Sequence, residues 1–268
     1  MEGEEPAVEE NREHKDPSSR RHAFVLGIII VLLVAGGAAA WFFLSSHSRD
    51  MGISVIRLEG VLVTGEGAGG GYTGSESIGR ALRDAAEDPF VDAIVLRVNS
   101  PGGTPAAAQE IIRDIAYAKQ RKPVVVSMGD IATSAAYYIS ASANRIYANP
   151  DTITGGIGTS WTFIDISEWL RERNISIEII ASGSRKDMGS GLRPLTPEER
   201  EYAQKIVNES NERFLADILA ARSINRSIVA DARVMRGQDA LDAGLVDELG
   251  NLNDAIEGAR RLASGGSP

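Results

Sequence analysis

The 268-residue chain contains no cysteine, which excludes disulfides, zinc–thiolate sites and cysteine nucleophiles. Histidine is nearly as scarce, and all three residues, His14, His22 and His47, lie within the first 50 positions. A Ser-His-Asp triad is therefore excluded from a domain that follows them. Lysine remains as the base for a nucleophilic hydroxyl. The chain has five lysines, which are Lys15, Lys119, Lys122, Lys186 and Lys205.

Acidic residues outnumber basic ones, so the net charge at pH 7 is −9, and the sequence has no stripe of clustered basic residues. Nucleic acid is not expected as a partner, since phosphate binding needs clustered Lys and Arg. The glycine-rich stretch 65–74 lacks the acidic residue that follows a dinucleotide-binding loop at the required distance. We therefore expect no nucleotide partner, no cofactor and no metal.

The N-terminal region divides into a polar segment, 1–22, and an uncharged apolar segment, 23–44. We expect residues 1–22 to be a disordered tail. As a helix, the 22 residues of 23–44 would be about 33 Å long, enough to cross a bilayer. A cleaved signal peptide is the alternative, with a cleavage site near Ala38–Ala40, although its apolar region would be shorter.

Orientation of this predicted transmembrane helix follows from the positive residues near its ends. More of them precede the span than follow it, which predicts a cytoplasmic N-terminus and an extracytoplasmic main domain in the cell membrane. The residues before the span are Arg12, Lys15, Arg20 and Arg21, and those after it are Arg49 and Arg57.

The remainder is predicted to be a linker at 45–52, one α/β domain at 53–262 and a flexible tail at 263–268. Strands that alternate with helices indicate a mostly parallel sheet. Strands are predicted at 53–63 (as a pair), 91–100, 122–130 and 175–182. Helices are predicted at 75–87, 105–120, 134–143, 164–173 and 196–222. A flexible loop is predicted at 65–74.

Ser134 follows a strongly apolar strand and begins a predicted helix. An ordinary helix cap is one interpretation. The other is a nucleophile, because a helix N-terminus offers free amides and partial positive charge to an oxyanion. The sequence Asn-Ser-Pro-Gly-Gly, 99–103, ends the preceding strand, and its glycine amides would be similarly open. An ordinary turn is the alternative for this segment.

Lys186 is the lysine best suited to act as the base, because it lies in a loop of small residues after a predicted buried strand. The other lysines of the domain lie on polar helix ends or charged helix faces. To accept a proton at neutral pH, Lys186 needs its pKa lowered from about 10.4 to about 7–8. The Asp187 side chain should then point away from it. A surface lysine is the alternative.

Four blocks resemble, in order, the short form of the signal peptide peptidase A family over residues 53–260. They are LRVNSPGG, SMGDIATSAAYYISASANRIYANPDTITGGIG, SGSRKDMGSGLRPLTPEER and GQDALDAGLVDELG. The resemblance implies a ClpP/crotonase-like spiral fold and a membrane-anchored serine protease. It implies Ser134 as nucleophile and Lys186 as general base, and oxyanion donors at Gly102, Gly103 and Ala135. Substrate-binding residues are implied at Thr154, Gly155, Gly156, Ile157 and Gly158.

The chain departs from the family pattern at Gly156, where a serine commonly hydrogen-bonds the catalytic lysine. The orienting hydroxyl would then come from Thr154, Ser160, Ser184 or water. Ala135 and Ala136 replace two glycines after the nucleophile, which leaves the backbone donor intact.

The resemblance further implies a homo-oligomer that degrades hydrophobic peptides such as signal-peptide remnants. Three alternatives stay open. They are a protease of a stomatin-like membrane protein, a catalytically silent peptide-binding scaffold, and a crotonase-like acyl-CoA enzyme.

Overall fold

The computed structural model describes residues 33, 36 and 52–266, and the unit formed by residues 51–268 is considered by itself. The predicted tail at 1–22 and nearly all of the predicted span at 23–44 lie outside the described residues. No helix in the described part of the chain is long and apolar enough to cross a membrane.

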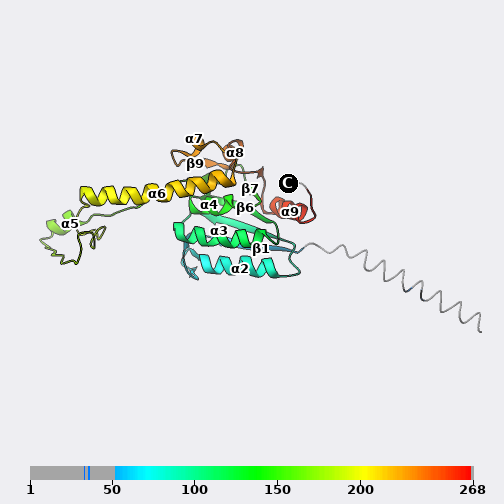
Figure 1. Ribbon diagram of the computed structural model, residues 1–268, viewed down its shortest axis with the longest axis horizontal. Helices are drawn as coiled ribbons and strands as arrows, with labels where there is room; N and C mark the ends of the chain where they lie inside the picture. The colour runs from blue at the N-terminus through cyan, green and yellow to red at the C-terminus, as the bar shows by residue number, and fades with distance from the viewer. Residues whose placement is uncertain (1–32, 34–35, 37–51, 267–268) are drawn as a thin grey trace, which may run out of the picture. The chain divides into compact units, whose positions relative to one another are not determined.

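A mostly parallel sheet forms the centre of this unit (Figure 1). Within residues 52–266 it has seven strands. Five parallel strands run in the order β1 (Ile53–Glu59), β5 (Ala93–Ser100), β6 (Val124–Thr133), β7 (Arg145–Ala148) and β10 (Glu248–Leu249). The last three residues of β6 pair with β8 (Ile153–Gly155), which pairs on its other side with β9 (Val234–Arg236). A small second sheet contains β2 (Val61–Val63), β4 (Tyr72–Gly74) and β3 (Ala68–Gly69).

Helices cover both faces of the main sheet, because alternate strand residues point to opposite sides. Ile94, Leu96 and Val126 belong to the larger core. This core also contains side chains of α2 (Ser75–Glu87), α3 (Pro105–Lys119) and α4 (Ala135–Ala141). Val95 and Val125 belong instead to a smaller core that contains side chains of α9 (Leu252–Ala263). The parallel strands are thus buried on both faces, as their continuous apolar sequences predict.

The long helix α6 (Pro197–Ala221) begins at a capping box between Thr196 and Glu199. Its C-terminal half packs near α4, while its N-terminal half extends toward α5 (Ser167–Glu172) (Figure 1). We call residues 160–196, which include α5, the arm. None of these residues is buried. The short helices α7 (Arg226–Val229) and α8 (Gly237–Asp242) follow α6.

Most predicted elements are confirmed, and the α/β class with a parallel sheet is confirmed with them. The strand predicted at 175–182 is wrong, because residues 175–181 are exposed and belong to no strand in the described part of the chain. The strands predicted as a pair at 53–63 do not pair with each other, because Gly60 turns the chain and β1 joins β5 while β2 joins β4. The predicted loop at 65–74 contains β3 and β4.

Candidate active site

Ser134 occupies the turn that joins β6 to α4, with φ 56° and ψ −125°. Such values are costly for a residue with a Cβ, and strained positions of this kind gather at functional sites. The backbone is held on both sides: its N–H donates to Gly155 O at 2.9 Å, and its carbonyl accepts from Tyr138 N at 2.9 Å. The hydroxyl makes no capping hydrogen bond to α4. Ser134 therefore occupies the cap position without using its side chain as a cap.

The glycine turn after β5 lies directly against Ser134. A Cβ on Gly102 would come within 2.9 Å of Ser134 Cβ and 3.0 Å of Ala135 N. Gly102 also has φ +105°, which favours glycine. A Cβ on Gly103 would come within 2.0 Å of Leu62 O. Both glycines are thus required by close backbone approach, one to Ser134 and one to β2.

Two backbone amides beside Ser134 are available to a ligand. Among the described residues, neither Gly103 N–H nor Ala135 N–H has a hydrogen-bond acceptor within the chain. Gly102 N–H differs, because it donates to Ser100 Oγ at 3.0 Å. Gly103 and Ala135 line one cavity together with Ser134. The arrangement can place two N–H donors on an oxygen that carries developing negative charge.

Ser134 lines two cavities. The smaller, ≈ 110 Å³, has walls from Gly103, Pro105, Gln109, Ala135, Tyr138, Gly158, Thr159, Ser160, Ser210 and Phe214. The larger, ≈ 490 Å³, has walls from Gly156, Gly158, Thr159, Ser160, Gln204, Val207, Asn208, Asn211, Ala230, Asp231 and Ala232. Both reach α6, so this helix forms a wall of the site from a distant part of the sequence.

The segment 154–158 runs past Ser134, but its residues are placed differently. Thr154 and Gly155 are paired on one side with β6 and on the other with β9, so both edges of the strand are occupied. Gly156 N–H donates to Arg233 O at 2.9 Å, and Ile157 is buried. Gly158 lines both cavities. Backbone open to a ligand therefore begins after Gly156.

Three of the four lysines in this unit have partners. Lys119 Nζ donates to Ser142 O at 2.7 Å, and burial lowers its pKa. Lys122 Nζ donates to the carbonyls of Ala85 and Asp88. Lys205 Nζ lies 3.8 Å from Glu209 Oε1, within ion-pair distance. Within residues 52–266, the Lys186 ammonium has no hydrogen-bond or ion-pair partner, and its side chain is exposed.

Lys186 does not lie in either cavity that contains Ser134. It belongs to the arm, in the segment between α5 and α6, which lies away from α4 (Figure 1). The Asp187 carboxylate is bound by Arg193, so it points to another partner, as the sequence predicted. Within one chain, the structure thus brings Ser134 together with Gly102, Gly103, Ala135, Gly156 and Gly158, but not with Lys186.

Comparison with known proteins gives the family. Residues 116–264, more than half of the chain, match the family described as Peptidase family S49. The chain belongs to Peptidase family S49. This confirms the resemblance stated above and the prediction of a serine protease family.

Relatives carry consistent names. A putative protease of Methanocaldococcus jannaschii is 36% identical over 190 residues, which cover 70% of this chain and 61% of that protein. Protease 4 of Haemophilus influenzae is 35% identical over 217 residues, 79% of this chain and 35% of that protein. A putative signal peptide peptidase SppA of Enterococcus faecium is 32% identical over 184 residues, 67% of this chain and 54% of that protein. The chain thus spans between about a third and two thirds of the length of these relatives.

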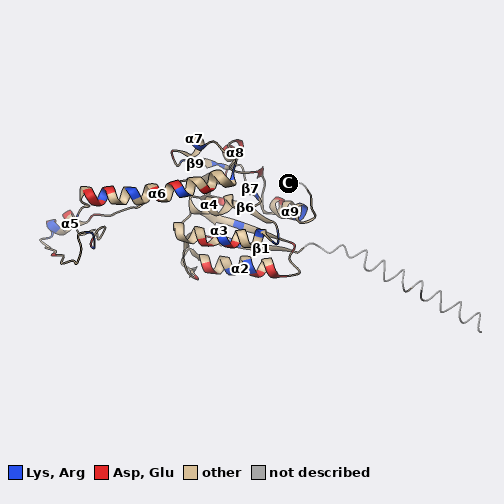
Figure 2. Ribbon diagram, in the orientation of Figure 1, with Lys and Arg blue, Asp and Glu red and all other residues tan. Residues whose placement is uncertain are grey.

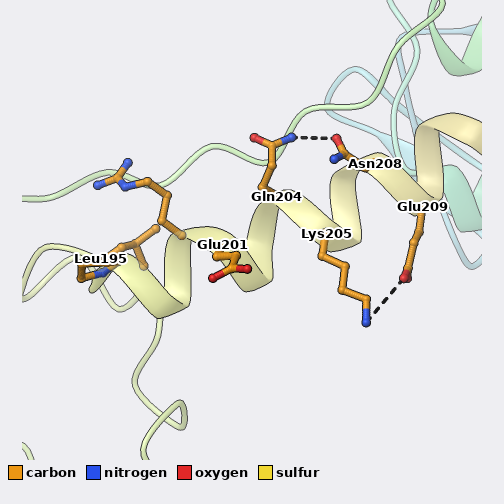
Figure 3. Close-up of a pocket in the computed structure, with 8 residues that line it drawn as sticks. Leu195, Glu201, Gln204, Lys205, Asn208 and Glu209 are labelled. Atoms are coloured by element: carbon orange, nitrogen blue, oxygen red, sulfur yellow. Dashed lines mark hydrogen bonds and ion pairs between the residues drawn. The ribbon is translucent and has the colours of Figure 1, made fainter.

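An open groove of ≈ 770 Å³ runs along the N-terminal half of α6 in this S49 chain (Figure 3). Its walls include Gln204, which donates to Asn208 at 2.8 Å, and both residues also line the larger Ser134 cavity. The groove and the site are therefore adjacent. Charged residues of both signs lie along α6, whereas α4 carries none (Figure 2).

Sequence reasoning missed the residues that α6 adds to the site. Phe214 packs on Tyr138 with ring centroids 4.5 Å apart, and both line the smaller cavity. Asn211 lines the larger cavity, and its Oδ1 atom is buried without a partner among the described residues. The periodicity of α6 predicts a helix, but nothing local in its sequence indicates which strand end it covers.

Proposed function

We propose that this chain is a serine endopeptidase in which Ser134 is the nucleophile and Lys186 the general base. The observation that carries the proposal is the strained Ser134 turn beside two free amides. It provides an attacking hydroxyl and an oxyanion site in one place. The S49 membership of the chain supports the same chemistry.

In the proposed reaction, Ser134 Oγ forms a bond to the scissile carbonyl carbon while its proton passes to the neutral Lys186 Nζ. Gly103 and Ala135 N–H groups stabilise the tetrahedral oxyanion. Collapse breaks the C–N bond, and the Lys186 ammonium returns the proton to the leaving amine. Water then hydrolyses the acyl-enzyme by the same proton transfers, which regenerates both side chains.

We propose that Lys186 reaches Ser134 of a neighbouring subunit in a homo-oligomer. The arm supports this, because its large apolar side chains are exposed, including Trp161, Ile164, Trp169, Ile177 and Ile180. Several large apolar side chains exposed within one segment favour a protein interface. Ile175, Ile177 and Ile179 alternate along an exposed segment that belongs to no strand. Ile175 N–H donates to Leu170 O at 3.0 Å, so backbone after Ile175 is where a partner strand could pair.

An incoming Lys186 ammonium would need an acceptor, since Gly156 has no hydroxyl to offer. The buried Oδ1 of Asn211 is one candidate in the cavity wall. Ser160 lines both cavities, and Ser184 lies two residues before Lys186. Thr154 is less suited, because it is buried and donates to Ala132 O at 2.8 Å.

We propose hydrophobic peptides as substrates, including signal-peptide remnants. An extended peptide would lie between the 102–103 turn and the open backbone after Gly156, forming backbone hydrogen bonds.

We also propose the ClpP/crotonase-like spiral as the finer description of the fold. The uncharged segment 23–44 is proposed as a membrane anchor with the peptidase domain on the extracytoplasmic side.

Two inactive variants test the dyad and its division between subunits. Ser134→Ala and Lys186→Met should each abolish hydrolysis of a hydrophobic fluorogenic peptide. Co-assembled in equal amounts, they should regain about a quarter of wild-type activity, because a quarter of interfaces would pair an intact Ser134 with an intact Lys186. A fluorophosphonate probe should label Ser134 in the wild type and in the mixture.

Each result has a distinct meaning. Full activity in either single variant would overturn the dyad. Two inactive variants whose mixture stays inactive, although native mass spectrometry shows mixed oligomers, would place both residues in one subunit. Absence of labelling in the wild type would favour a catalytically silent scaffold.

A further inference from the structure

Arg193 lies at the centre of an ion cluster with Asp187, the residue after Lys186, and Glu199. Its Nε donates to Asp187 Oδ2 at 2.7 Å and its Nη2 to Asp187 Oδ1 at 2.9 Å. The same guanidinium donates to both carboxylate oxygens of Glu199, at 2.8 and 2.7 Å. One guanidinium thus binds two carboxylates in bidentate fashion, which is the strongest arrangement of such pairs.

The cluster is attached to α6. Glu199 is 2% exposed, and its side chain also accepts from Thr196 N at 2.9 Å in the capping box. Arg193 Nη1 donates in addition to Pro194 O at 3.0 Å. The Asp187 carboxylate is therefore connected through Arg193 to the first turn of a 25-residue helix. No side chain of the arm is buried, so these hydrogen bonds to α6 are what hold the Asp187 carboxylate in place.

Because Arg193 binds the Asp187 carboxylate, that carboxylate is not available to pair with Lys186. A carboxylate within about 4–6 Å of an amine favours the charged amine and raises its pKa. Asp187 is adjacent to Lys186 in sequence and would be the nearest carboxylate to pair with it. Arg193 lowers the pKa of Asp187 by hydrogen bonding, which agrees with a carboxylate already satisfied.

The other charged groups around Lys186 do not replace Asp187 in this role. Arg185 is itself positive, and its guanidinium carbon lies 5.0 Å from the centre of the Tyr202 ring. Glu199 is bound to Arg193, and Glu198 lies on the first turn of α6. On the Ser134 side, Asp231 lines the larger cavity, but its Oδ2 lies 2.6 Å from Arg233 Nη2. Asp187, Glu199 and Asp231 are thus bound by arginine, whereas Glu198 has no ion pair among the described residues.

We propose that Arg193 is a positioning residue that keeps Asp187 away from Lys186, so that the lysine can lose its proton near neutral pH. This inference rests on the proposed role of Lys186 as the base. It assigns to Arg193 a function in the reaction although Arg193 does not touch the substrate. Without Arg193, the Asp187 carboxylate would pair with Lys186 and keep its amine charged.

The test compares Arg193→Ala with Arg193→Ala/Asp187→Asn. In the single variant, Asp187 is free to pair with Lys186, so the pH midpoint of kcat/KM should rise by about one unit and activity at pH 7 should fall about tenfold. In the double variant, the carboxylate is neutral, so the midpoint should return toward the wild-type value. A structural role alone would lower activity equally at every pH, and the double variant would not restore it.

Asp187→Asn alone provides a variant that retains the Arg193–Glu199 pair and the fold of the helix start. Its midpoint should equal that of the wild type. A loss of activity at all pH values in Asp187→Asn would show that Lys186 depends on Asp187, and this would overturn the proposal even if Arg193→Ala does not fold.

A second measurement separates this inference from the proposed function. The pH dependence of Lys186 modification by an amine-reactive reagent is followed by peptide mass spectrometry in the Ser134→Ala background. Its midpoint should rise with Arg193→Ala and return with Asp187→Asn added. An unchanged midpoint would overturn the role of Arg193 while leaving the dyad intact. Full activity of Lys186→Met would overturn the dyad, whatever the labelling result.

Discussion

From Val124 to Ala141 the chain passes through β6 and α4 with most side chains buried, whereas none of residues 160–196 is buried. In the first region, hydrogen bonds and glycine contacts within one chain fix the strained Ser134 backbone. In the arm, apolar side chains face solvent, and the ion cluster of Arg193 connects Asp187 to the start of α6. The Ser134 backbone is therefore pre-organised by folding. In the proposed oligomer, the position of Lys186 would depend on contacts with a neighbouring subunit.

Gly102→Ala tests the first region and should have the largest effect. The new Cβ would lie 2.9 Å from Ser134 Cβ at a residue with φ +105°, so it would displace Ser134 and the neighbouring amides. We expect kcat/KM to fall by about 10²–10³, the loss that follows removal of one oxyanion donor. Peptide hydrolysis and probe labelling of Ser134 should fall together.

Gly65→Ala is the matched control, because Gly65 has φ +96° but nothing lies within 4 Å of its added Cβ. It imposes similar backbone strain without contact with Ser134. If both variants lose activity equally, backbone strain and not the approach to Ser134 is responsible, and the pre-organised site would be in doubt.

Ile177→Asp/Ile180→Asp tests the arm and should have the next largest effect. Both side chains are exposed in one chain, and Ile180 is 92% exposed. Charges at a subunit interface should weaken assembly, with activity reduced roughly tenfold at limiting subunit concentration. Activity should recover as concentration rises, and sedimentation velocity should show smaller species.

Phe90→Asp supplies the comparison outside the arm. Phe90 is also largely exposed and lies between α2 and β5. Its replacement should change neither assembly nor activity. Arm variants that assemble normally and remain fully active would contradict the division of the site between subunits.

Much of the fold is predictable from local pattern, and particular elements show why. The helix at 75–87 has its predicted boundaries, and the helix predicted at 196–222 runs from Pro197 to Ala221 after a Thr196 cap. Their signals are periodicity and capping, which act within a few residues. The strand predicted at 175–182 shows the limit. Its alternating isoleucines favour an extended segment, but a strand requires a partner that the sequence pattern does not specify.

The candidate site divides in the same way. Ser134 and the glycine turn could be predicted because strands that are adjacent in a parallel sheet bring their ends together. The contribution of Asn211 and Phe214 could not be predicted, because it depends on how α6 crosses α4. The Arg193 cluster was equally hidden, since Asp187 and Glu199 are six residues away on either side and meet only when the chain turns into α6.

Glu199→Gln tests the fixed position within the arm and should have the smallest effect. Hydrogen bonds from Arg193, with a further bond from Thr196 N, lower the pKa of Glu199 from 4.5 to about 2. A lowered carboxyl pKa contributes stability above the unfolded value, and this contribution is lost as pH falls through the folded value. The stability difference between wild type and Glu199→Gln should therefore be full above about pH 5 and disappear between about pH 4.5 and 2. Urea unfolding at several pH values measures it, with Glu201→Gln, an exposed residue on the same helix, as control. A difference that stays constant over this range would mean that the ionised carboxylate is not what anchors the arm to α6.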